Sequence, residues 1–136
     1  MRITVDTNIL VRVAVNDDPE QASRARDLLR DAETVVLTLP ALCEFVWVAR
    51  RGYRRQAADV ADAMRELLAS TSVVVDRPAA EAGVTMLMAG GDFADGVIAF
   101  DGRRLGGEVF ASFDRRTVEL IAAQGREVHF LGTGSD

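Results

Sequence analysis

The chain has 136 residues, a formal net charge of −5, and 49% hydrophobic against 27% charged side chains. This balance is that of a folded globular domain and excludes a disordered chain. The negative charge argues against non-specific coating of nucleic acid, and a single cysteine excludes an intramolecular disulfide. No apolar run is long enough for a membrane span, and the N-terminus does not have the pattern of a signal peptide, so we expect a cytoplasmic protein.

Short apolar runs alternate with helical patterns along the chain, which is typical of a parallel α/β sheet. Asp18 and Pro19 predict the cap and first residue of a helix that ends near residue 31, and Pro40 opens another that Gly52 ends. Strands are expected over residues 2–6, 34–37, 72–75, 108–112 and 128–131. Further helices are expected between residues 53 and 71, from residue 78 to the glycines at 90 and 91, and over residues 92–105 and 114–124.

These elements predict a single-domain α/β/α sandwich over residues 1–131. Right-handed crossovers between parallel strands place the helices on both faces of a central sheet. We expect that sheet to be mainly parallel, with four to five strands. Residues 132–136, which are rich in glycine, are expected to form a flexible tail.

Two aspartates follow predicted strands. Asp6 ends the first strand and Asp114 follows the fourth. In open α/β sheets functional groups collect beyond the carboxyl ends of the strands, so both carboxylates are expected at the same edge of the sheet. Asp114 also stands where it could simply cap the last helix.

Further acidic residues come from predicted helices. Glu44 borders an apolar helix face, where a carboxylate is costly unless it is paired with an arginine such as Arg50 or binds a cation. Asp95 lies in a first helical turn, where it could also merely favour the helix dipole. Asp92 is predicted first of all to be the N-cap of that helix. Gly96 leaves room for close approach by a neighbouring strand or a ligand.

Bringing Asp6, Glu44, Asp95 and Asp114 together predicts a metal site. Carboxylates within a few ångströms of one another disfavour ionisation unless a cation binds them. Oxygen ligands alone suit Mg²⁺ or Mn²⁺, and the single histidine, His129, is far from these acids in the sequence, which argues against zinc. The expected reaction is hydrolysis of a phosphodiester by metal-activated water.

Four segments, in order, resemble the PIN-domain ribonucleases, and specifically the VapC toxins of toxin–antitoxin pairs. These segments are Val5-Asp6-Thr7-Asn8-Ile9-Leu10, Leu42-Cys43-Glu44, Asp92-Phe-Ala-Asp95-Gly-Val-Ile-Ala99 and Ser112-Phe113-Asp114. Their order and spacing cover nearly the whole chain.

The resemblance implies roles for individual residues. Asp6, Glu44, Asp95 and Asp114 would be the catalytic acids, with Asp6 and Asp95 as direct ligands of Mg²⁺ or Mn²⁺. Asn8 and Ser112 match positions that orient the carboxylates, and Ser112 stands where many members carry threonine. The resemblance also implies structured RNA, such as tRNA or rRNA, as substrate. Homodimers and a VapB-like antitoxin that covers the active site are implied as well.

A polyanionic substrate needs cations near an acidic pocket. The candidates for contacts with the RNA backbone are Arg50, Arg51, Arg54, Arg55, Arg115 and Arg116. A solvated face or surface ion pairs would explain the same arginines. Trp47 and Tyr53, on the neighbouring helices, could be core residues or part of an interface.

Two other functions compete with this one. An aspartyl phosphoryl-transfer protein would also place Asp6 at a strand end, but the chain has no lysine and carries Asn8 where the phosphatase type needs a second aspartate. A catalytically inactive PIN-like binding module would keep the fold alone. The presence of all four acids argues against it.

Overall fold

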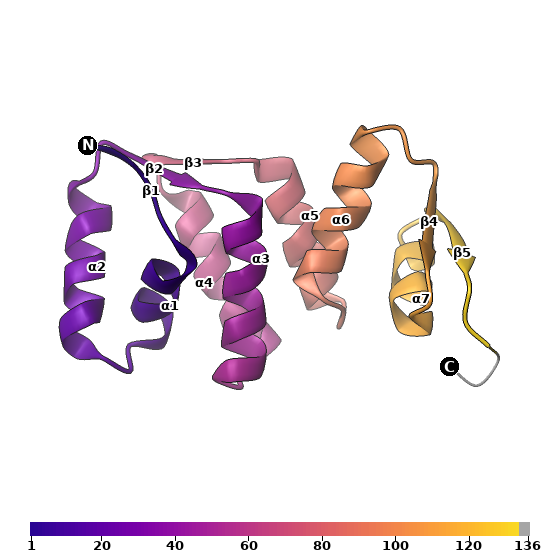
Figure 1. Cartoon of the computed structure of the whole chain (residues 1–136), viewed down its shortest axis with the longest axis horizontal. Coiled ribbons are helices and arrows are strands. Elements are labelled where there is room, and N and C mark those ends of the chain that lie inside the picture. The colour runs from indigo at the N-terminus through magenta and orange to yellow at the C-terminus, as the bar shows by residue number, and fades with distance from the viewer. Residues whose placement is uncertain (134–136) are drawn as a thin grey trace. The chain divides into compact units, whose positions relative to one another are not determined.

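The computed structural model describes residues 1–133 and divides the chain into two compact units, Met1–Ala80 and Glu81–Asp136 (Figure 1). The boundary falls inside helix α5 (Arg77–Met88). Residues 134–136 of the predicted flexible tail lie outside the described residues. The extent of one domain over residues 1–131 stays a prediction.

The first unit contains a parallel three-stranded sheet in the order β1–β2–β3. Strand β1 (Arg2–Thr4) pairs with β2 (Thr34–Leu37), and β2 pairs with β3 (Val73–Val75). The register places Ile3 opposite Val35 and Val36 opposite Val74. The carboxyl ends of β1 and β2 therefore lie side by side, and each leads directly into a helix that begins near that edge.

Helix α1 (Thr7–Val15) follows β1 and packs against α2 (Pro19–Asp31) and α3 (Leu39–Trp47). The π-helical segment Val48–Gly52 continues α3, and α4 (Ala57–Ala69) leads to β3. The core of this unit is apolar, with Leu10, Leu42, Phe45 and Met64 fully buried. Helix α1 is the element that the sequence pattern does not predict. Its isoleucine and valines are β-branched and favour strands, and only the cap and the packing make the segment helical.

The second unit contains α6 (Phe93–Arg104), β4 (Val109–Ser112), α7 (Arg115–Ala123) and β5 (Glu127–Phe130). Strands β4 and β5 are parallel, and α7 packs against both (Figure 1). The core is formed by Met86, Ala99 and Ile121, on which partly buried side chains pack, namely Phe110, Leu120 and Val128. Asp114 lies in the tight connection between β4 and α7.

The predicted α/β class with parallel strands is confirmed. The five strands pair in two groups, of three and of two, a division that the alternating pattern does not predict. All the predicted helices and strands are present, with ends that differ from those expected by a few residues. In the described part of the chain, none of the helices has the length and apolar character to cross a membrane.

Close packing of two helices positions the start of α6 within the second unit. A Cβ built at Gly96 would stand 2.6 Å from the Ala82 carbonyl oxygen and 2.7 Å from Met86 Cβ, both on α5. The space at Gly96 is therefore occupied by a neighbouring helix, and not by the strand or ligand that the sequence leaves open. Since Asp95 is the preceding residue, this contact also fixes where its carboxylate emerges.

Gly96→Ala is expected to lower the free energy of unfolding by about 1–3 kcal/mol, because the added methyl group must push the two helices apart. The matched control is Gly102→Ala in the same helix, where a Cβ meets nothing within 4 Å. That change is expected to stabilise the protein by up to about 1 kcal/mol, since alanine is the better helix former. Urea denaturation of both variants measures the difference, and equal effects would contradict the close contact.

Candidate functional site

Asp6 stands at the junction of β1 and α1 and caps the helix. Its Oδ1 accepts a hydrogen bond from the Thr7 backbone N–H at 2.7 Å, and its backbone is extended, as N-cap residues require. Thr7 is buried, and its Oγ1 donates to Glu44 Oε2 of α3 at 3.3 Å. Thr7 therefore contacts two carboxylates: its backbone N–H donates to Asp6, and its hydroxyl group donates to Glu44.

Asp6 and Glu44 line the same pocket of the first unit. The other lining residues belong to the ends of β1 and β2 and to the start of α3: Thr4, Val5, Thr7, Thr38, Pro40 and Ala41. Thr38 closes this end of α3 by accepting a hydrogen bond from the Ala41 N–H at 3.4 Å. The pocket thus lies at the carboxyl ends of two neighbouring parallel strands, where open α/β sheets place their functional groups.

Asp114 occupies the corresponding position after β4 in the second unit. Its Oδ1 accepts from the Thr117 N–H at 3.0 Å, so Asp114 is the N-cap of α7. Ser112 Oγ accepts from the Asp114 N–H at 2.9 Å and fixes the backbone that carries this carboxylate. Asn8 is exposed and, in the part of the chain that the structure describes, its side chain makes no hydrogen bond. Its orienting role stays a prediction.

Asp95 lies in the first turn of α6 and accepts a hydrogen bond from a second buried threonine. Thr117 Oγ1 donates to Asp95 Oδ2 at 3.2 Å. Asp92 caps α6, with Oδ1 accepting from the Ala94 N–H at 3.2 Å, which confirms the role predicted from its position. Asp95 is therefore held between the cap of its own helix and the first turn of α7.

The electrostatics of the second unit single out Asp95. Partial burial raises the pKa of its carboxyl above the ordinary value, and repulsion from Asp92 adds to the shift. The hydrogen bond from Thr117 opposes these effects by favouring the charged form, while Asp114 contributes further repulsion. A bound cation would relieve both the desolvation and the repulsion, so the surroundings of Asp95 suit a positively charged ligand.

The two units use the same local device. In each, an aspartate after a strand caps a helix, and a threonine in the first turn of that helix donates its hydroxyl to an acid on another helix. Thr7 and Thr117 are the two polar residues that are buried within the described chain. Sequence reasoning assigned neither a role. Their position one or three residues after a capping aspartate is the signal that could have found them.

The oxygen atoms that these residues offer as ligands fit a hard divalent cation, since all belong to carboxylate or hydroxyl groups. Within residues 1–133, the structure contains no cluster of three His, Cys, Asp or Glu side chains with the geometry of a metal site. Asp6 and Glu44 belong to the first unit, and Asp95 and Asp114 to the second. The joining of all four into one metal site therefore stays a prediction.

The predicted RNA-contact arginines have varied surroundings. Arg50 donates to the Arg55 carbonyl oxygen at 2.9 Å, Arg51 lies over the Trp47 ring, and Arg55 donates to the Val15 carbonyl oxygen at 3.3 Å. The Arg115 guanidinium lies 4.4 Å from the centre of the Phe130 ring and also donates to the Thr133 carbonyl oxygen. An ion pair of Glu44 with Arg50 or Arg51, the alternative to metal binding, is not formed in the described residues.

Comparison with known families identifies the class of protein. The model of the PIN domain family matches residues 3–123. The chain therefore belongs to the PIN domain family, whose members are typically nucleases that use divalent metal ions. The α/β/α fold expected from the sequence is the PIN fold. A search of curated proteins found no match.

Asp95→Asn is expected to stabilise the metal-free protein at neutral pH. A carboxyl whose pKa is raised on folding costs stability once the pH exceeds its unfolded value of about 3.9, because the folded state resists ionisation. The gain should therefore be present at pH 7 and disappear below about pH 4. Thermal unfolding in EDTA at both pH values measures it.

Glu119→Gln, an exposed acid on α7, is the control for loss of one charge from the same unit. It is expected to change the melting temperature little at either pH. A fall in the melting temperature of Asp95→Asn at pH 7 would contradict the account of Asp95 given above.

Proposed function

We propose that the protein is a metal-dependent endoribonuclease, the toxin of a VapBC-type toxin–antitoxin pair, which cleaves structured RNA such as tRNA or rRNA. The observation that carries the proposal is the repeated arrangement of a strand-end aspartate, a buried threonine and a helix-borne acid. Membership of the PIN domain family supports hydrolysis of a phosphodiester as the reaction.

The carboxylates are arranged so that oxygens are free for a ligand. Asp6 and Asp114 use Oδ1 to cap their helices, and in the described residues their Oδ2 atoms accept no hydrogen bond. Asp6 and Asp95 are the proposed metal ligands, and Glu44 and Asp114 orient the attacking water. Bound Mg²⁺ or Mn²⁺ supplies an activated water and stabilises the charge that develops on the phosphate.

The two buried threonines hold acids of the proposed site in place by hydrogen bonds. The hydroxyl groups of Thr7 and Thr117 restrict the rotamers of Glu44 and Asp95, and the hydrogen bond from Thr117 also favours the charged form of Asp95. Preorganised ligands need no rearrangement when the ion binds, and this preserves binding free energy. The two threonines are thus positioning residues in the proposed enzyme.

The proposed partner is a VapB-like antitoxin that covers the active site, and the proposed assembly is a homodimer that joins it in a hetero-oligomer in the cytoplasm. The first unit offers a surface suited to such a partner. Helices α1, α2, α3 and α4 contribute to a mainly apolar cavity of about 310 Å³, with Leu10, Leu29, Phe45 and Leu67 among its lining residues. An apolar peptide segment would bury this surface.

The nuclease assay incubates the protein, checked by mass spectrometry for co-purified peptide, with total tRNA and rRNA and Mn²⁺. Asp6→Asn and Asp95→Asn are each expected to lower the cleavage rate by about a hundredfold or more, the scale of losing one charged group from a reacting site. The double variant should be no slower than the slower single one, because groups that act as a unit are not additive.

Asp59→Asn, an exposed residue of α4, is the control and should cleave like the wild type. EDTA should abolish cleavage by all variants. Cleavage that survives EDTA or both substitutions would overturn the metal-nuclease proposal. Inert wild-type protein without bound antitoxin would favour a binding module, and a phosphoenzyme formed on Asp6 would favour aspartyl phosphoryl transfer.

A further inference from the structure

Trp47 is exposed in a helix most of whose large apolar residues are buried. It ends α3 with 55% of its surface exposed, whereas Leu42, Phe45 and Val46 of the same helix are 0–2% exposed. The chain contains no other tryptophan. Exposure of so large an aromatic ring contributes little to folding, so its flat surface is available for a ligand.

A cation lies against this ring. The Arg51 guanidinium carbon is 6.0 Å from the centre of the Trp47 ring, within reach of a cation–π contact. Arg51 belongs to the π-helical segment, closed by the Tyr53 N–H donating to the Val48 carbonyl oxygen at 3.1 Å. Such wide turns are rare and are frequently found at functional sites. The aromatic face and the cation therefore form one local arrangement.

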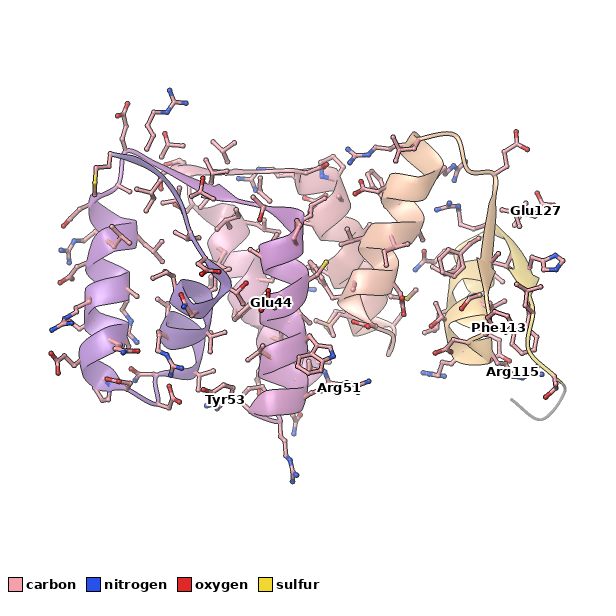
Figure 2. The ribbon with its side chains drawn as sticks, viewed as in Figure 1. Glu44, Arg51, Tyr53, Phe113, Arg115 and Glu127 are labelled. Atoms are coloured by element: carbon pink, nitrogen blue, oxygen red, sulfur yellow. The ribbon has the colours of Figure 1, made fainter. Side chains whose placement is uncertain are left out.

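Glu44 lies on the same side of this helix as Trp47. The two residues are three apart, and residues at this spacing are neighbours on a helix surface. Figure 2 shows Glu44 near the middle of the helix, with Arg51 and Tyr53 towards the end that carries the π-helical segment. The order along the surface is a proposed catalytic acid, then the indole ring, then the arginine.

Four arginines follow Trp47 closely in the sequence. Arg50, Arg51, Arg54 and Arg55 fall within six residues, and in the described part of the chain none of the four pairs with a carboxylate. Asp17 is nearby through its hydrogen bond with Tyr53, but Arg12 hydrogen-bonds it and holds its pKa below the ordinary value. In a chain of net charge −5, this surface favours a polyanion.

We propose that Trp47 is a stacking platform for an unpaired nucleobase of the RNA substrate, with Arg51 contacting the adjacent phosphate. The proposal rests on the proposed ribonuclease function and adds that the enzyme recognises single-stranded nucleotides beside the scissile bond. Bases within a duplex are already stacked, so only a base in a loop, bulge or end can lie on the indole face. The residues three and four positions after Trp47 are Arg50 and Arg51, and these cations favour RNA over an apolar protein surface.

Tryptophan fluorescence tests this platform directly because the only indole in the chain is the proposed contact. Wild-type protein in EDTA, where hydrolysis does not proceed, is titrated with a single-stranded oligouridylate and with the same strand annealed to its complement. Stacking should quench the emission with the single strand and leave it nearly unchanged with the duplex.

Variants separate stacking from charge and from loss of fold. Trp47→Leu should weaken binding of a labelled single strand about 5- to 150-fold, the range for loss of one stacked base, while Trp47→Phe should retain most of the affinity. Arg51→Gln should weaken binding and reduce its salt dependence. The control for loss of an exposed apolar side chain is Val74→Ala in the same unit, whose wild-type side chain is 54% exposed. This variant should bind the single strand like the wild type.

Absence of quenching, equal quenching by duplex, or unchanged affinity of Trp47→Leu would overturn the platform. An emission change that follows protein concentration without RNA, and self-association lost in Trp47→Leu, would overturn it in favour of a second copy of the chain. Its failure is distinct from failure of the ribonuclease. Quenching without cleavage in Mn²⁺ rejects only the enzyme, whereas cleavage with an unchanged KM in Trp47→Leu rejects only the platform.

Discussion

Repulsion between carboxylates is the constraint on which the site depends. Acids placed near one another resist ionisation. At Asp95, partial burial is the largest cause of the raised pKa, and repulsion from Asp92 and Asp114 adds to it. Hydrogen-bond donors contact each of these acids. Helix N–H groups donate to the capping aspartates, and threonine hydroxyls donate to the acids on helices. These donors hold the charges in place, and a divalent cation completes the neutralisation in the proposed enzyme.

Some acids of the proposed site also stabilise the fold, because they cap helices. Asp6 and Asp114 satisfy the first turns of α1 and α7 through Oδ1, and Thr7 and Thr117 link those turns to a second helix. The close contact at Gly96 then sets where α6 presents Asp95. A strand end, a cap and the contact between two helices, each ordinary by itself, together position Asp6, Asp95 and Asp114.

The sequence predicts the positions of the acids better than their contacts. Strand ends locate Asp6 and Asp114, and the Asp92 cap and the helix that Pro19 opens follow from local rules. Helix α1 is missed because its β-branched residues favour a strand, and only the Asp6 cap and packing reverse that preference. Local position could mark Thr7 and Thr117, but the acids that they contact and the exposure of Trp47 depend on residues distant in the chain, so local pattern does not reveal these.

Calorimetric titration of Mn²⁺ into wild type, Asp6→Asn and Asp95→Asn tests the central proposal, that Asp6 and Asp95 are both ligands of the metal ion. Each substitution is expected to weaken Mn²⁺ binding by about tenfold or more, the scale of losing one group that ligates the ion or orients a ligand. Unchanged Mn²⁺ binding in both variants would contradict the account, as would loss confined to one variant while the other binds like the wild type.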